Sequence, residues 1–144
     1  MTDGKAARLD EIIASHAHRE GPMLPILHDV QAEFGHVSED AKRTIAKALN
    51  LSRAEVHGVV SFYHDFKAEP VGKPVLKLCR AESCKARGVE NLVAAAEAAA
   101  GDRVEIETIY CLGLCSVGPN AMIGKRPYAM LDVPKIEALI REMA

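Results

Sequence analysis

Four cysteines are the residues of this sequence best suited to chemistry, and they form two pairs of unequal spacing. Cys79 and Cys84 stand in CRAESC with four residues between them, and Cys111 and Cys115 stand in CLGLC with three. Thiolates act as metal ligands and as redox groups. In a reducing compartment disulfides are not expected to hold a fold together, so metal binding or redox chemistry is favoured. No set of catalytic residues with a convincing spacing accompanies them.

Several kinds of site use cysteines, and the spacing helps to separate them. A thioredoxin-type redox pair has two residues between its cysteines, unlike either pair here. A Rieske centre also needs two histidines, and none of the six histidines lies between residues 65 and 144. Structural zinc uses four cysteines but favours tight knuckles, and unrelated buried thiols rarely form two facing loop pairs. A 2Fe-2S cluster with one cysteine pair on each iron fits best, and a zinc site is the alternative.

The segment before the cysteines is predicted to be a helical bundle. Apolar residues recur at helical spacing in three stripes between residues 26 and 63, and a weaker stripe surrounds Leu9. Ser38 can cap one of these helices, and Ser52 with Glu55 forms a capping box at the start of the next. This half of the chain contains no cysteine.

The segment that follows is predicted to contain a mixed sheet. FKAEPVGKP, at residues 66–74, has two prolines and a glycine and indicates a connector. After it we expect a strand at 74–79, an alanine-rich helix at about 89–100, a strand at 104–110, a hairpin made of AMIG and PYAML, and a last helix from Pro134 to about Met143. This order matches a minimal thioredoxin-like topology. We therefore expect an α+β chain with a helical bundle at 1–70 and a thioredoxin-like domain at 71–144.

The predicted strands would bring the two cysteine pairs together. Cys79 ends the first strand and Cys111 follows the second. Because the ends of parallel strands emerge at the same edge of a sheet, the two pairs become neighbours in space. Gly113 and Gly118-Pro119 favour a loop for the second pair, and such a loop lets backbone N–H groups approach a negatively charged cluster. The sequence thus predicts a four-thiolate site.

The cysteine layout resembles the thioredoxin-like 2Fe-2S ferredoxin family. C-x4-C is followed, after 26 residues, by C-x3-C with a glycine inside it and a proline four residues after the last cysteine. LPILHDVQAEFG and SEDAKRTIAKALNLSRAEVHGVVSFYHDF are similar to the small 2Fe-2S subunit of complex I and its relatives in formate dehydrogenases and hydrogenases. EVHGVVSFYHDF and LKLCRAESCKARG look most like the gamma subunit of the soluble, molybdenum-containing, NAD-dependent formate dehydrogenases. Complex I members more often have threonine where this chain has Arg80 and alanine where it has Gly118.

This resemblance implies an oxidoreductase subunit that transfers electrons and is not catalytic when isolated. It implies one 2Fe-2S cluster with four ligands, Cys79, Cys84, Cys111 and Cys115. It also implies a partner subunit that binds FMN and NAD, and a larger molybdenum-containing catalytic subunit, as in an NAD-dependent formate dehydrogenase. The sequence itself has no dinucleotide-binding or Walker-type motif. The alternatives are the equivalent small subunit of complex I (NADH:quinone oxidoreductase) or of an NAD-reducing hydrogenase and, from another class, a zinc-binding regulatory domain.

Other side chains are assigned supporting roles. Three cations flank the first cysteine pair and can offset the negative charge of a cluster, or can serve as surface charges: Arg80, Lys85 and Arg87. The helical half is expected to dock on the flavin subunit. Its aromatic residues are expected in the core, with anchor positions at that interface as the alternative: Phe62, Tyr63 and Phe66. His57 and His64 are expected to serve packing or an interface rather than catalysis.

Composition excludes some other classes of function. Of the 144 residues 49% are hydrophobic, which is enough for a core, and the formal net charge is −2 with Lys and Arg scattered along the chain. A nucleic-acid partner is therefore not expected. The N-terminus lacks the layout of a signal peptide, and no apolar run is long enough for a membrane span. We expect a cytoplasmic protein.

Overall fold

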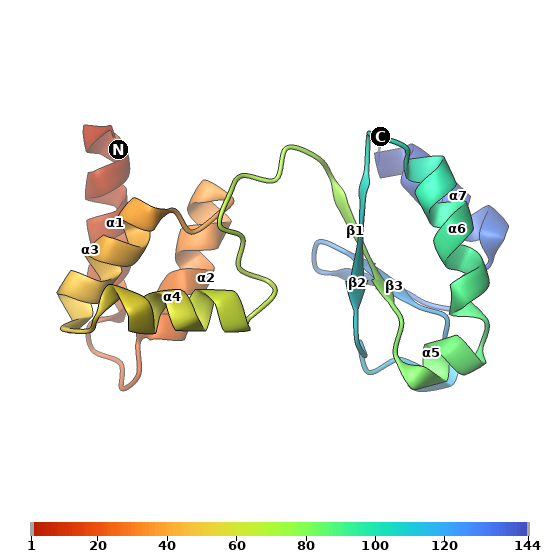
Figure 1. Ribbon diagram of the computed structural model, residues 1–144, viewed down its shortest axis with the longest axis horizontal. Coiled ribbons are helices and arrows are strands. Elements are labelled where there is room, and N and C mark those ends of the chain that lie inside the picture. The colour runs from red at the N-terminus through yellow and green to blue at the C-terminus, as the bar shows by residue number, and fades with distance from the viewer. Residues whose placement is uncertain (1, 144) are drawn as a thin grey trace. The chain divides into compact units, whose positions relative to one another are not determined.

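The computed structural model describes residues 2–143, and the chain divides between residues 71 and 72 into two compact units (Figure 1). Each unit has its own hydrophobic core. In the described part of the first unit there are four helices, α1 (Asp3–His16), α2 (Met23–Phe34), α3 (Glu39–Leu49) and α4 (Arg53–Phe62). The second unit holds a four-stranded sheet and its helices.

The helix ends in the first unit follow the predicted signals. Ser38 Oγ accepts a hydrogen bond from the backbone N–H of Ala41 at 3.2 Å and caps α3. Ser52 and Glu55 form the predicted capping box, in which each side chain accepts a hydrogen bond from the other residue's backbone N–H, and it starts α4. Gly35 has a φ of 76° and ends α2 in the left-handed conformation that glycine favours.

The core of the first unit is made by the apolar stripes of its helices. Its fully buried members include Leu9, Ile26, Leu27, Val30, Ile45 and Val56.

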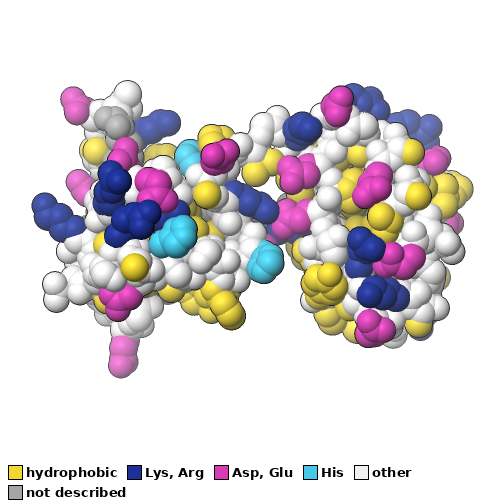
Figure 2. Space-filling model, viewed as in Figure 1, with side chains coloured by type: hydrophobic (Ala, Val, Ile, Leu, Met, Phe, Trp, Pro, Cys, Tyr) yellow, Lys and Arg dark blue, Asp and Glu magenta, His cyan; other side chains and the backbone are white. Residues whose placement is uncertain are grey.

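The aromatic residues near the end of α4 were predicted to lie in this core. The prediction is wrong for two of them, because Phe62 is 73% exposed and Tyr63 is 43% exposed. Phe66 is buried as expected. Val56 and Val60 form the buried side of α4, so Phe62 at its end is left facing outward. Figure 2 shows hydrophobic side chains at the surface along this part of the chain.

The second unit is built on a mixed sheet with strand order β2-β1-β3-β4. Its strands are β1 (Val75–Cys79), β2 (Glu105–Ile109), β3 (Ala121–Ile123) and β4 (Arg126–Tyr128). β1 pairs with β2 in parallel and with β3 antiparallel, and β3 and β4 form the predicted hairpin. The sequence-based prediction of an α+β fold with a thioredoxin-like second half is therefore confirmed.

Two helices, α6 (Val89–Ala100) and α7 (Val133–Met143), cover one face of this sheet (Figure 1). Leu76 and Leu78 alternate with the half-buried Val75 and Lys77 along β1 and are buried on that face. Ile136 and Ile140 of α7 are also fully buried and belong to the same cluster. This layer fixes β1 and hence the position of the residues at its carboxyl end.

Two short elements were not expected from the sequence. The helix α5 (Glu82–Ala86) carries Cys84, and a single 3-10 turn, η1 (Cys115–Val117), occupies part of the segment predicted to be loop. None of the described helices is long and apolar enough to cross a membrane.

Candidate metal centre

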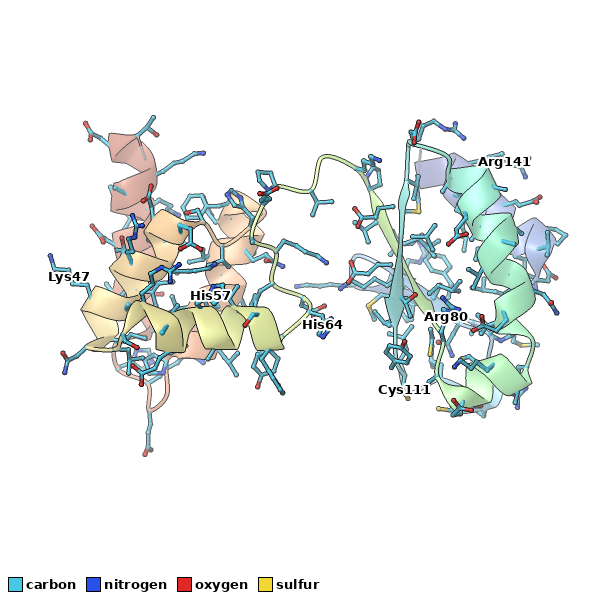
Figure 3. All side chains as sticks on the ribbon, viewed as in Figure 1. Lys47, His57, His64, Arg80, Cys111 and Arg141 are labelled. Carbon is cyan, nitrogen blue, oxygen red and sulfur yellow. The ribbon has the colours of Figure 1, made fainter. Side chains whose placement is uncertain are left out.

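The carboxyl ends of β1 and β2 bring the cysteines together. Cys79 is the last residue of β1, and its partner in the parallel ladder is Ile109, the last residue of β2. Cys111 follows two residues later, and Figure 3 shows it at the end of β2 with Arg80 at the neighbouring strand end. The predicted meeting of the two cysteine segments at one sheet edge is thus present in the fold.

The thiols approach each other as two pairs. The Sγ atoms of Cys111 and Cys115 lie 3.6 Å apart. The side chains of Cys79 and Cys84 are also close enough for each thiol to shift the pKa of the other. The pairs are connected across the edge, because the backbone N–H of Cys111 donates to Cys79 Sγ at 3.2 Å. All four cysteines are free thiols. Across residues 2–143, no three His, Cys, Asp or Glu side chains converge as ligands of one metal ion.

The two pairs differ in their exposure to solvent. Cys79 and Cys84 are each 1% exposed and form part of the hydrophobic core, whereas Cys111 and Cys115 lie at the surface. A group bound between the pairs would have one side against the core and the other side open. The open side is therefore the one that another molecule can approach.

Backbone N–H groups surround Cys79. Burial opposes ionisation of its thiol, but hydrogen bonds from the backbone N–H groups of Ala81, Cys111 and Leu112, together with the Cys84 side chain, lower its pKa below the ordinary value. The pKa of Cys84 is raised, by burial first and then by the neighbouring Cys79 thiol. These donors would stabilise negative charge on a thiolate.

The Cys111–Cys115 loop needs left-handed backbone conformations. Cys111 has a φ of 72° and Gly113 a φ of 77°, and the backbone N–H of Gly113 donates to Cys111 Sγ at 3.4 Å. A left-handed residue other than glycine is uncommon and costs free energy. Here this conformation turns the chain so that Cys111 and Cys115 lie on the same side of the loop.

Gly118 provides the close approach between the two cysteine segments. A Cβ atom at this position would lie 3.2 Å from Cys84 Sγ and 3.2 Å from Cδ of Arg87. Only a residue without a side chain fits there without displacing a neighbour. Gly118 was predicted to keep this segment a loop, and the packing against Cys84 is a further reason for a glycine.

Two polar side chains contact the Cys111–Cys115 loop, which is the second loop of the site. No sequence pattern predicted these contacts. Ser83 Oγ donates to the carbonyl oxygen of Cys115 at 2.9 Å, and Asn120 Nδ2 donates to the carbonyl oxygen of Leu114 at 3.0 Å. Neither residue belongs to a spacing motif, and the contacts exist only after the sheet has formed. The one available signal was a polar residue directly after Pro119, within an otherwise apolar segment.

The cations near the first pair have different surroundings. Arg80 is engaged in an ion pair with Glu90, and Lys85 lies 3.7 Å from the Glu82 carboxylate. Arg87 is exposed and its aliphatic stem reaches the position of Gly118. The predicted cationic surroundings are therefore present, but Arg80 is largely neutralised by its partner.

The donor set fits a 2Fe-2S cluster. Each iron of such a cluster takes two thiolates, and the cysteines here stand as two pairs at one edge, with backbone N–H groups directed at their sulfur atoms. A thioredoxin-like domain with such a site defines a class of small iron-sulfur proteins. The chain belongs to the thioredoxin-like 2Fe-2S ferredoxin family, whose pattern it matches over residues 9–144.

Relatives in this family are subunits of larger oxidoreductases. The chain is 27% identical to the NADP-reducing hydrogenase subunit HndA of Solidesulfovibrio fructosivorans, covering 92% of this chain and 82% of the relative. It is 30% identical to an NADH-quinone oxidoreductase subunit of Escherichia coli K12, covering 94% of this chain and 89% of the relative. It is 28% identical to an NADH-quinone oxidoreductase subunit of Rhizobium meliloti, covering 92% of this chain and 84% of the relative.

A solved structure has the same fold within a much longer chain. An NAD+-reducing NiFe hydrogenase in its air-oxidised state superposes with a TM-score of 0.71 at 26% identity, over 84% of this chain. This chain spans only 22% of that hydrogenase chain.

Proposed function

We propose that this chain is an electron-transfer subunit that holds one 2Fe-2S cluster on Cys79, Cys84, Cys111 and Cys115. The observation that carries the proposal is the pairwise approach of these thiols at the shared end of two parallel strands. Cys79 and Cys84 would bind one iron, and Cys111 and Cys115 the other. A bound 2Fe-2S cluster supplies the uptake and release of single electrons.

The chain's own residues would control the charge and the access of such a cluster. The hydrophobic core behind Cys79 and Cys84 excludes water from one side. The backbone N–H groups that donate to Cys79 and Cys111 offset the negative charge of the thiolates. The exposed Cys111 and Cys115 side gives an electron donor or acceptor a short path to the site.

The complex in which the subunit works is proposed to be an NAD- or NADP-linked oxidoreductase with a separate flavin subunit. The hydrogenase and NADH-quinone oxidoreductase relatives support a place in one of these two kinds of complex. They favour these alternatives over the gamma subunit of a formate dehydrogenase, which rests on the resemblance of EVHGVVSFYHDF and LKLCRAESCKARG. A molybdenum-containing partner and a cytoplasmic location both stay predictions.

The first unit is proposed to dock on the flavin subunit. The exposed Phe62 and Tyr63 border a shallow open groove of about 580 Å³ whose other lining residues include Met23, Leu51 and Val59. Exposed aromatic residues beside an apolar groove are typical anchors of a protein interface. This role replaces the expected core position of both aromatic residues.

The experiment that tests the proposal combines spectroscopy with reduction by a partner. The chain is purified anaerobically with its co-expressed flavin subunit, and NADH is added. We expect bleaching of the visible absorption and an EPR signal of a reduced 2Fe-2S cluster, and we expect Cys79→Ser and Cys111→Ser to lose the normal signal. A colourless wild-type protein with bound zinc would support the zinc-binding alternative. Assays of the whole complex with hydrogen, formate or a quinone then separate the three oxidoreductases.

A further inference from the structure

Asn120 is the one buried residue whose backbone contacts the first cysteine pair and whose side chain contacts the second loop, among the residues that the structure describes. It is 1% exposed and directly precedes β3. Its carbonyl oxygen accepts a hydrogen bond from the backbone N–H of Cys79 at 3.1 Å. Its own backbone N–H faces the thiol of Cys84. The backbone of Asn120 is therefore fixed against Cys79 and Cys84.

The side chain of Asn120 reaches the other cysteine segment. Its Nδ2 donates to the carbonyl oxygen of Leu114 at 3.0 Å, and Leu114 directly precedes Cys115. The same carbonyl oxygen accepts a second hydrogen bond from the backbone N–H of Val117. The two bonds together fix the turn that presents the Cys115 thiol. The bond from Asn120 ties this turn to a residue whose backbone is itself hydrogen-bonded to Cys79, the last residue of β1.

The amide oxygen of Asn120 indicates that this side chain does not serve to stabilise the fold. Asn120 Oδ1 is buried, and no donor among residues 2–143 reaches it. A buried polar atom without a partner costs free energy, and an apolar side chain at this place would not carry that cost. The hydrogen bond from Nδ2 to Leu114 is thus the reason that we find for an asparagine at position 120.

Besides the bond from Asn120 and the backbone bond from Cys111 to Cys79 Sγ, the described residues give the Cys111–Cys115 loop one further side-chain hydrogen bond to the first cysteine segment. Ser83 Oγ donates to the carbonyl oxygen of Cys115, but this bond lies at the surface, where water can replace it. We propose that Asn120 is a positioning residue that holds the Cys111–Cys115 loop in place against Cys79 and Cys84. The inference rests on the proposed 2Fe-2S function for its purpose, because a four-thiolate site requires both pairs to keep their separation.

Loop motion in the metal-free chain can be measured independently of any cluster. We compare hydrogen exchange of the amides of residues 112–117 in the wild type, Asn120→Leu and Asn120→Asp. Both variants lack the Nδ2 donor, and the second keeps the shape of the side chain. Exchange in the loop is expected to be about 2- to 12-fold faster, the factor for losing one net hydrogen bond. If Asn120→Leu does not fold, Asn120→Ser, which is too short to reach Leu114, replaces it.

Two matched variants serve as controls. Ser83→Ala removes one exposed hydrogen bond from the same loop and is expected to change exchange less than twofold. Asn91→Leu makes the same kind of substitution at an exposed position of α6 and is expected to leave the loop unchanged. Unchanged loop exchange in the Asn120 variants, or an equal effect of Asn91→Leu, would overturn the proposal.

The loaded protein gives a second readout. Loss of iron to an excess of a ferrous chelator is expected to accelerate by about the same 2- to 12-fold in the Asn120 variants, because each opening of the loop exposes the site. The EPR g values of the reduced cluster are expected to shift in these variants and not in Asn91→Leu. Iron loss at the wild-type rate despite faster loop exchange would contradict a positioning role. A wild type that binds no iron would defeat the proposed function, while the exchange experiment would still decide the role of Asn120.

Discussion

Arg80 donates two hydrogen bonds to Glu90, from Nε to Oε1 at 3.0 Å and from Nη2 to Oε2 at 2.6 Å. The hydrogen bond from Arg80 holds the pKa of the Glu90 carboxyl below its usual value. Arg80 directly follows Cys79, so a positive charge beside the proposed cluster is compensated by a carboxylate on α6. The net field of this pair at the cluster is therefore small.

Glu90→Gln is expected to raise the midpoint potential of the bound cluster. Removing the carboxylate leaves the charge of Arg80 uncompensated, and this charge stabilises the added electron. At roughly 7 Å and an effective dielectric between about 20 and 80, one charge is worth about 25 to 100 mV for a one-electron couple. A redox titration measures the shift. Lys125→Gln, in the hairpin at the other end of β3, is the control, and an equal shift in both variants would contradict a local effect.

Lys85→Ala is expected to shift the same potential in the negative direction by tens of millivolts. Lys85 lies one residue after Cys84, and its ion pair with Glu82 is long, at 3.7 Å between exposed groups. Such a pair compensates the ammonium charge less than Glu90 compensates Arg80. An unchanged potential in the redox titration would reject a tuning role for Lys85 and leave it as a surface charge.

Gly118→Ala is expected to weaken the second unit, although alanine is a small residue. The new Cβ would lie 3.2 Å from Cys84 Sγ, and Cys84 is buried, so the sulfur atom has to move by a few tenths of an ångström. We expect a lower free energy of unfolding and faster loss of iron. Gly58→Ala is the matched control, because that glycine lies within α4 with no atom near its Cβ position. The control is expected to stabilise by about 0.5 to 1 kcal/mol.

Glu39→Gln is expected to destabilise the first unit in a pH-dependent way. Lys42 is 2% exposed, and its Nζ donates to Glu39 Oε1 at 2.7 Å. This bond lowers the pKa of Glu39 below the ordinary 4.5, so the stabilisation is full above pH 4.5 and is lost as the pH falls through the lower folded-state pKa. Unfolding midpoints of wild type and variant should differ at pH 7 and converge in acid. Glu11→Gln, which breaks an exposed pair with Arg8, should change them less.

Phe62→Ala is expected to weaken the complex with the flavin subunit without unfolding the chain. The side chain is 73% exposed, so its removal costs little in folding. If it is an interface anchor, affinity should fall about 30-fold, which corresponds to about 2 kcal/mol. Val133→Ala, an exposed apolar position on α7, is the control. Equal affinities of wild type and Phe62→Ala by titration would show that this surface does not bind the partner.

Local signals allowed much of the fold to be predicted from the sequence. The Ser52–Glu55 capping box is a contact between residues three apart, so spacing alone reveals it. The parallel pairing of β1 and β2 follows from two short β-rich runs with a helix between them, and it explains why Cys79 and Cys111 meet. These features depend on periodicity and on the geometry of a crossover.

The remaining features depend on tertiary contacts that no local pattern encodes. Phe62 continues the apolar pattern of α4, yet the core is already filled by Val56 and Val60, and the aromatic side chain is left outside. The helix α5 has only five residues and too short a pattern to detect. The contact from Asn120 to Leu114 joins a residue at the start of β3 to a loop carbonyl, and it exists only once both are in place.

The central claim is that the four cysteines together bind one 2Fe-2S cluster, and the iron and acid-labile sulfide content of the anaerobically purified chain tests it most directly. We expect two irons and two sulfides per chain in the wild type, with a reddish-brown colour. We expect this content to be lost when one cysteine of each pair is replaced, as in a Cys84→Ser and Cys115→Ser double variant. A colourless wild type with one zinc per chain, or full iron and sulfide in the double variant, would contradict it.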